Sequence, residues 1–127
     1  MKYLHTMIRI LDADVALDFF VNKMGMKVIR ESPNEAGQYT NYFLAYSEDD
    51  PPLELTYNWG ETEPYATGRF FGHLAYEVDN IYEFCEKLQA NGVTINRPPR
   101  DGNMDFIKSP DGQSIDLLKK CDPLPIE

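Results

Sequence analysis

The chain has 127 residues, which suits one ordinary domain or two very small half-domains and excludes two cores of normal size. Hydrophobic residues make up 43% and charged residues 26%, a globular composition that excludes collagen-like and disordered chains. Lys and Arg number 12 against 21 Asp and Glu, and the resulting net charge of −9 argues against nucleic acid and anionic membranes as partners.

The chain begins with the pattern of a strand, a helix and three further strands. The first strand is expected within residues 4–12, and helical periodicity follows over residues 15–21. Asp12 or Asp14 is placed to cap the first helical turn, and Gly25 is placed to end the helix. Three strands are then expected at 27–31, 39–46 and 53–57.

The same order of elements returns in the second half of the chain. Residues 72–80 resemble the first strand, and residues 81–88 have helical periodicity, with Asp79 or Asn80 as the cap and Gly92 at the end. Further strands are expected at 94–96, 104–108 and 114–119. Each half carries a histidine near the start of its first strand, so the chain is predicted to be a β-α-β-β-β unit repeated twice.

This repeat predicts an α+β fold made of two βαβββ units. We expect one domain over 1–127, built from units 1–59 and 69–120 that are joined by a linker at 60–68. A four-stranded sheet with one helix leaves a concave face uncovered, so two such faces, in one chain or in two, are expected to cover each other and form a cleft.

Each half also places a carboxylate between apolar residues of its last strand. These carboxylates are Glu54, between two leucines, and Asp116, between Ile115 and Leu117. Taken singly, each is expected to be a solvent-facing charge on a half-buried strand, because side chains alternate between the two faces.

The same alternation, applied to all the strands, indicates a metal site. It groups His5 with Met7 and Arg9, Glu54 with Thr56 and Asn58, and His73 with Arg69 and Phe71. If these faces line the concave interior, two imidazoles and two carboxylates meet and can bind a divalent transition metal with room for water. The alternative is that both histidines are hydrogen-bonded core residues.

Such a site suits proton abstraction next to two oxygens. A metal with open positions can chelate both oxygens and stabilise an enediolate, while a loosely held carboxylate takes the proton.

Cys85 offers no rival chemistry, because Glu83 and Glu86 surround it with negative charge that does not activate a thiol. We interpret Cys85 as a core residue.

Four segments of the chain carry a family resemblance: LHTMIR at 4–9, ELTYNWG at 54–60, Gly72-His73, and SPDGQSID at 109–116. Together they resemble glyoxalase I (lactoylglutathione lyase), a family of the vicinal oxygen chelate superfamily. The resemblance extends over nearly the whole chain. The ELTYNWG segment is specific to that enzyme, whereas the repeat and the Pro-Asp-Gly turn are shared across the superfamily.

The resemblance implies curved mixed sheets of the glyoxalase fold, paired in a homodimer with shared active sites. It implies isomerisation of the hemithioacetal of methylglyoxal and glutathione to S-lactoylglutathione, with carboxylate proton transfer through a metal-stabilised enediolate, and thus methylglyoxal detoxification. The implied metal ligands are His5, Glu54, His73 and Asp116, with Asp116 or Glu54 as the catalytic base. The chain is similar to the short bacterial form, which implies Ni ahead of Co or Zn.

Glutathione is the co-substrate that the resemblance implies. Its contacts fall on Arg9, Asn58, Arg69 and Arg97, where arginines would give an acidic protein a locally positive pocket. Met7, Phe70 and Phe71 are candidates for the pocket that takes the methyl group.

One position departs from the family, which usually has Glu where Asp116 stands. The shorter side chain can misplace a ligand or base by about 1 Å, which can cost on the order of a hundredfold in rate. Two alternatives stay open: a metal-free or lapsed binding module of the drug-sequestering type, and another superfamily enzyme such as an epimerase or dioxygenase. The two histidines favour the metal-dependent lyase.

The location of the protein is expected to be cytoplasmic. The first residues lack the apolar segment of a secretion signal, and no apolar run is long enough to span a bilayer. The two cysteines, Cys85 and Cys121, show no disulfide-type or CxxC spacing, which favours a reducing compartment.

Overall fold

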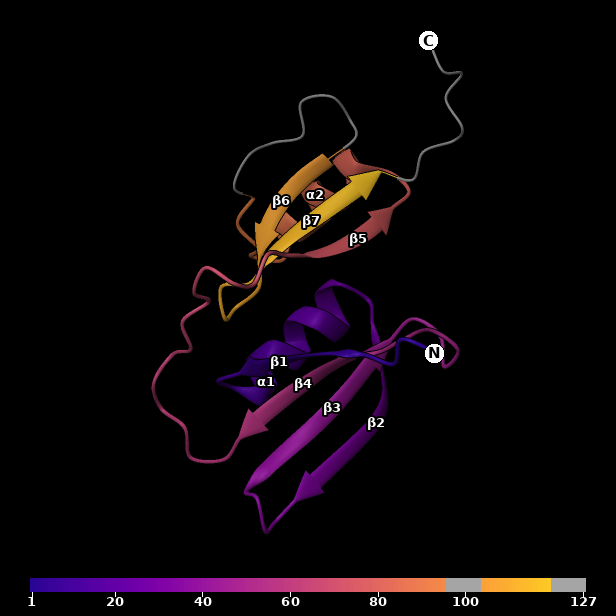
Figure 1. The fold of residues 1–127 in the computed structure, drawn as a ribbon. Helices are drawn as coiled ribbons and strands as arrows, with labels where there is room; N and C mark the ends of the chain where they lie inside the picture. Colours follow the sequence, from indigo (N-terminus) through magenta and orange to yellow (C-terminus); the bar gives the residue numbers. More distant parts are fainter. Residues whose placement is uncertain (96–103, 120–127) are drawn as a thin grey trace. The chain divides into compact units, whose positions relative to one another are not determined.

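The computed structural model describes residues 1–95 and 104–119 and divides the chain into two compact units, Met1–Ala66 and Thr67–Glu127 (Figure 1). Among the described residues, none of the helices combines the length and the apolar character that crossing a bilayer requires.

Unit 1 is a four-stranded mixed sheet with one helical segment. Its elements are β1 (Thr6–Ile10), α1 (Ala13–Leu17), the π-helical η1 (Asp18–Lys23), β2 (Lys27–Asn34), β3 (Tyr39–Ala45) and β4 (Leu53–Asn58). The strand order is β1-β4-β3-β2, in which β1 runs parallel to β4 and the other pairs are antiparallel. The first and last strands of the unit are therefore neighbours.

Unit 2 repeats this arrangement. It contains β5 (Leu74–Val78), α2 (Ile81–Ala90), β6 (Met104–Lys108) and β7 (Ser114–Lys119), in the strand order β5-β7-β6. Here β5 is parallel to β7 and β6 is antiparallel to it. The strand predicted at 94–96 is represented by one antiparallel bridge from Ile95 to Ile107, and Asn96 lies outside the described residues. The predicted α+β fold of two mixed sheets is confirmed.

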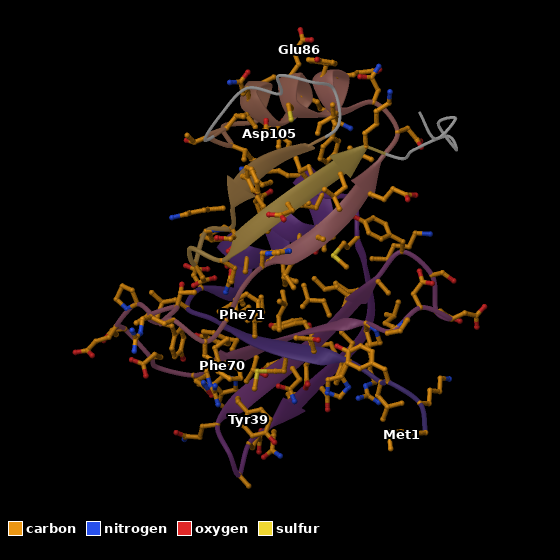
Figure 2. The ribbon with its side chains drawn as sticks, turned by 45° about the horizontal axis from the view of Figure 1, so that its top comes forward. Met1, Tyr39, Phe70, Phe71, Glu86 and Asp105 are labelled. Carbon is orange, nitrogen blue, oxygen red and sulfur yellow. The ribbon has the colours of Figure 1, made fainter. Side chains whose placement is uncertain are left out.

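The segment before β5 differs from the sequence prediction. Residues 68–70 form a turn in which Gly68 has φ +70°, and β5 begins only at Leu74. The alternation that grouped Arg69 and Phe71 with His73 is therefore wrong, because alternate residues share a face only in an extended strand. Phe70 is fully exposed at 104% relative accessibility (Figure 2).

Apolar side chains hold each sheet against its helix. In unit 1 the most buried large side chains are Ile10, Phe20, Leu44 and Leu55. In unit 2, Ile81, Cys85 and Leu88 form the buried face of α2, while Glu86 on the same helix points away from the sheet (Figure 2). This one-sided burial gives each sheet a second face on which polar side chains can be presented.

The sequence predicts two possible capping residues for each helix, and in the structure each helix begins at one of them. Asp12 caps α1, where its carboxylate accepts a hydrogen bond from the Val15 N–H at 3.1 Å. Asn80 caps α2 by accepting from the Glu83 N–H, also at 3.1 Å. Gly25 and Gly92 follow the helices with φ of +80° and +85°, the left-handed conformation that favours glycine.

The cap of α1 gives a stability prediction. Asp12→Ala should lower the free energy of unfolding by about 1 kcal/mol, because it leaves an N–H at the start of the helix without its partner. Urea unfolding monitored by circular dichroism measures the change. Asp12→Asn is the matched control, since asparagine caps as well as aspartate. Equal losses in the two variants would contradict the capping role.

Candidate functional site

Each unit places one histidine beside one carboxylate at the same register. His5 immediately precedes β1, and Met7, two residues on, pairs with Glu54 in the parallel ladder. His73 immediately precedes β5, and Ala75, two residues on, pairs with Asp116. The two histidine–carboxylate pairs are thus built identically, from the residue before the first strand and a residue of the last.

The members of each pair are in direct contact. His5 Nε2 lies 3.0 Å from Glu54 Oε1, and His73 Nε2 lies 3.2 Å from Asp116 Oδ2. Glu54 is 8% exposed and Asp116 is 9% exposed, so the expectation of solvent-facing charges is wrong for both. Asp116 reaches its imidazole although its side chain is one methylene shorter than glutamate.

Both pairs have donors suited to a divalent metal. Imidazole nitrogen and carboxylate oxygen together bind ions such as Ni, Co and Zn. Two ligand atoms that each lie about 2.1 Å from one ion are separated by about 3.0 Å at a right angle and about 3.4 Å at the tetrahedral angle. The observed separations fit this range, and they equally fit a hydrogen bond within each pair.

Each unit by itself supplies two such donors. Over residues 1–95 and 104–119, no group of three or more His, Cys, Asp or Glu side chains is gathered at one point. The four-residue ligand set of His5, Glu54, His73 and Asp116 remains a prediction. The structure shows two contacting pairs of these residues, His5 with Glu54 and His73 with Asp116.

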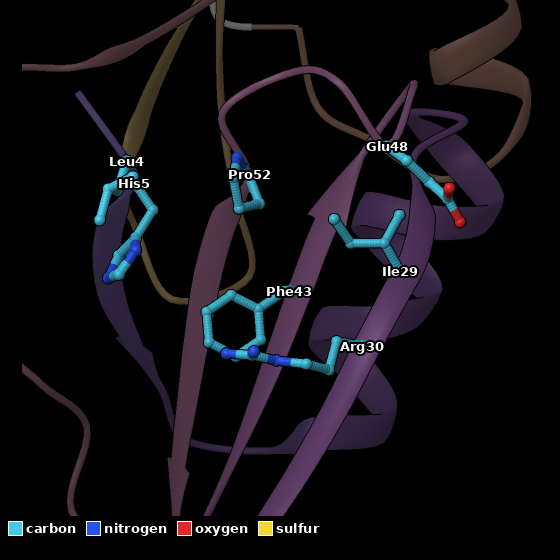
Figure 3. A pocket seen from close by; sticks show the side chains of 7 residues that line it. All are labelled: Leu4, His5, Ile29, Arg30, Phe43, Glu48 and Pro52. Carbon is cyan, nitrogen blue, oxygen red and sulfur yellow. The ribbon is translucent and has the colours of Figure 1, made fainter. Parts of the chain in front are cut away.

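A pocket lies beside His5 in unit 1 (Figure 3). Leu4, Ile29, Phe43 and Pro52 form its apolar lining, and its volume is about 500 Å³. The polar side chains on its walls are His5, Arg30 and Glu48. The pocket therefore combines an apolar floor with one arginine next to a candidate metal ligand.

Ring contacts connect the pocket to the His5–Glu54 pair. His5 and Phe43 make an edge-to-face ring contact, with centroids 5.8 Å apart and an interplanar angle of 85°. The Arg30 guanidinium carbon lies 4.0 Å from the centroid of the Phe43 ring, a cation–π contact. Phe43 thus separates Arg30 from His5 by a single ring.

The candidate glutathione contacts lie in both units. Arg9 is in β1 opposite Thr56, and Asn58 ends β4, where its amide donates to the Tyr65 hydroxyl at 3.1 Å. Arg69 lies in the turn before β5, and Arg97 lies outside the described residues. Met7, proposed for the methyl pocket, does not line the pocket beside His5.

Cys85 is a core residue, as the sequence predicted. It is 3% exposed and its thiol donates to Asp105 Oδ2 at 3.3 Å. Burial, together with this hydrogen bond and the negative charge of Asp105, raises the pKa of the Cys85 thiol to about 12. The thiol therefore stays protonated at neutral pH and is not a nucleophile.

Sequence reasoning missed Arg30 and Phe43. They form a directly opposed pair, and Phe43 in turn opposes Glu54, so the row Arg30–Phe43–Glu54 crosses three strands. The Phe43–Glu54 pairing follows from aligning β3 with β4. The position of Arg30 depends on the β2–β3 hairpin, which starts at Asn34 opposite Tyr39 and keeps an unbroken register to Arg30 opposite Phe43, and the predicted strand at 27–31 does not reach that hairpin.

Comparison with known proteins gives a consistent family assignment. Residues 2–117 match the family described as "Glyoxalase/Bleomycin resistance protein/Dioxygenase superfamily". The chain is 38% identical to the lactoylglutathione lyase of Escherichia coli O157:H7, and the match covers 96% of this chain and 95% of that protein. It is 39% identical to a probable lactoylglutathione lyase of Vibrio parahaemolyticus, covering 93% and 90%.

A solved structure with the same fold is the glyoxalase I of Leishmania major, described as trypanothione-dependent. Its TM-score is 0.89 and its identity 36%, over 94% of this chain and 86% of that one. The glyoxalase I of Zea mays matches with a TM-score of 0.87 and 31% identity, over 95% of this chain and 45% of that one.

Proposed function

The chain belongs to the glyoxalase/bleomycin resistance protein/dioxygenase superfamily, and on this basis we propose that it is a metal-dependent lactoylglutathione lyase. Its reaction is the isomerisation of the hemithioacetal of methylglyoxal and glutathione to S-lactoylglutathione, which removes methylglyoxal. The observation that carries the proposal is the pair of His–carboxylate contacts at equivalent registers of the two units.

His5, Glu54, His73 and Asp116 are the residues that would hold the metal. When bound, a divalent ion supplies Lewis acidity that polarises two adjacent substrate oxygens and makes the neighbouring C–H more acidic. Ni is the ion proposed first, with Co and Zn as alternatives, because imidazole and carboxylate donors serve all three.

The carboxylates of Glu54 and Asp116 are the groups that can move the substrate proton. Each has one oxygen in contact with an imidazole, so the second oxygen can accept a proton from carbon. Their low exposure keeps bulk water from competing for that proton. A carboxylate that accepts the proton from one carbon and returns it to the next completes the isomerisation.

Arginine and amide side chains are proposed to orient glutathione. Arg9, Asn58, Arg69 and Arg97 are the candidates, since a guanidinium grips a carboxylate through two parallel hydrogen bonds. On a chain with a net charge of −9, such cations attract an anionic thiol conjugate locally. Glutathione is the thiol proposed for this chain. The Leishmania major relative is instead described as dependent on trypanothione.

A homodimer in the cytoplasm completes the proposal. Each unit offers two metal-binding side chains. A site with four protein ligands therefore needs one unit 1 and one unit 2, which can come from the same chain or from two chains. The absence of disulfide-type cysteine spacing in the sequence supports the cytoplasmic location.

The direct test is an assay of metal-dependent turnover. The protein is stripped with a chelator and reloaded with Ni, Co, Zn or Mg, and thioester formation from methylglyoxal and glutathione is followed by absorbance. We expect turnover that depends on the added metal.

Two other outcomes would contradict full lyase function. Tight metal binding without turnover, with turnover restored by Asp116→Glu, would identify a lapsed lyase whose base is misplaced by one methylene. No binding of any of the four metals would favour a metal-free sequestering module.

A further inference from the structure

The pocket beside His5 is larger than methylglyoxal requires. Its volume of about 500 Å³ is many times that of the methyl group that distinguishes methylglyoxal from the simplest 2-oxoaldehyde. Its apolar floor with a single arginine is the usual composition of a site that takes an apolar chain ending in a polar group.

The β2–β3 hairpin places Arg30 in this pocket. Its register runs without a break from Asn34–Tyr39 to Arg30–Phe43, and Phe43 opposes Glu54, so Arg30 lies in the same row as Glu54. Beyond Arg30 the register shifts by one residue towards Val28, an irregularity of the kind that is common next to active sites, and both Ile29 and Arg30 line the pocket. The contact with Phe43 then fixes the guanidinium at 4.0 Å from the ring centroid.

The stacked guanidinium keeps its hydrogen-bonding edge available. Its N–H donors lie in the plane of the group, so stacking on the Phe43 face leaves them able to grip a carboxylate. Within residues 1–95 and 104–119, Arg30 forms no ion pair with a carboxylate. Glu48 lines the same pocket, but its carboxylate points away from Phe43 (Figure 3).

On the sheet of unit 1 this pocket lies beside Glu54 and towards the start of β4, whereas the candidate thiol contacts lie towards the ends of β1 and β4. Arg9 and Asn58 lie towards the ends of β1 and β4, and Asn58 is four residues beyond Glu54, a distance of about 13 Å along the strand. Pocket residues such as Leu4 and Pro52 lie before those strands begin. The face therefore has two regions, one level with the His5–Glu54 pair and one further along β1 and β4.

A hemithioacetal of a 2-oxoaldehyde matches this division. The sulfur is on one carbon of the chelated pair and the side chain of the aldehyde is on the other, so the two substituents diverge from the chelated pair. If the thiol extends towards Arg9 and Asn58, the aldehyde side chain extends into the pocket and reaches Arg30.

We propose that Arg30 is a specificity-determining residue that binds a carboxylate at the end of the aldehyde side chain. The substrate class is 2-oxoaldehydes with a short acidic side chain. This inference rests on the proposed function, because it assigns the two ends of the same substrate.

The test compares two aldehydes of matched shape. The metal-loaded enzyme is assayed with glutathione and either 4,5-dioxopentanoate or 5-methyl-2-oxohexanal, in which an isopropyl group replaces the carboxylate. We expect kcat/KM to favour the acidic aldehyde by at least about tenfold, the scale of one charge-assisted bidentate contact. Arg30→Met should remove this preference, and Arg30→Lys should keep part of it.

The matched control is Lys27→Met, which removes a cation from the same strand outside the pocket and should leave the preference unchanged. A ratio of two substrates is insensitive to a general loss of folded enzyme, so destabilisation by Arg30→Met does not imitate the expected result. An equal fall for both aldehydes in Arg30→Met would overturn the assignment.

Two further arms separate the possible failures. If Arg30→Met slows both aldehydes with glutathione but not with glutathione ethyl ester, the bound carboxylate belongs to the thiol and the inference is overturned. Methylglyoxal turnover by the unmodified enzyme reports on the proposed function. Absence of turnover with every aldehyde overturns both proposals, whereas methylglyoxal turnover with no acidic preference overturns the assignment of Arg30 alone.

Discussion

His5→Ala and His73→Ala should each lower metal affinity and kcat/KM for the hemithioacetal by at least about 100-fold. Removing even an outer-shell partner of a metal ligand costs about 10- to 100-fold, and a histidine that binds the ion directly contributes more. Each substitution also leaves a buried carboxylate without the imidazole that contacts it at 3.0 or 3.2 Å.

Competition with a chromogenic chelator measures the affinity, and thioester formation measures turnover. Tyr82→Ala, at an exposed position of α2, is the control for a substitution that removes a ring outside both His–carboxylate pairs. Thermal unfolding of all variants shows whether a lost site reflects a lost fold. If only one histidine affected metal binding, the two pairs would not share one ion.

Mixing the two histidine variants should restore activity if the sites are shared between subunits. In a heterodimer of His5→Ala and His73→Ala chains, one site carries both substitutions and the other site carries none. Co-expressed chains with two different affinity tags, purified over both tags, should therefore regain about half of the unmodified activity per dimer.

The same experiment distinguishes sites formed within one chain. Every site of the mixed dimer would then carry one substitution, and the purified heterodimer would be as inactive as its parents. As a control for effects of tagging, each variant is also purified alone, once with each of the two tags. Activity that stays at the parental level in a verified heterodimer would contradict shared sites.

Much of the fold followed from local sequence signals. Strands β6 and β7 have the bounds that the sequence predicted, because alternation is clear there and the turn between them is marked by Ser109-Pro110-Asp111-Gly112. The turn is closed by a side-chain hydrogen bond between Ser109 and Gln113. Gly112 has φ +89°, which the Pro-Asp-Gly pattern anticipates.

Other elements depended on interactions that no local pattern encodes. The sequence predicts one helix over residues 15–21, but the helical segment changes to π-helical geometry at Asp18, in the stretch that buries Phe19 and Phe20. Strand β2 continues to Asn34 because β3 pairs with it along its whole length.

The candidate site was predictable to the extent that it repeats. Histidines at equivalent positions and carboxylates in equivalent strands indicated both pairs, and the parallel ladders bring each pair together. Arg30 was not predictable, because its place opposite Phe43 depends on the β2–β3 hairpin, which starts at Asn34, beyond the predicted end of that strand at residue 31. Periodicity alone does not fix the register of such a hairpin.

The parallel pairing of the first and last strands determines when each half-site can form during folding. His5 and Glu54 come from opposite ends of unit 1, so their encounter requires closure of a loop that contains α1, β2 and β3. Contacts of such long sequence separation are slow to form and arise late. Metal binding by a newly synthesised chain would then show that an entire unit has folded. In a truncated or misfolded unit, the histidine and the carboxylate would not be brought together.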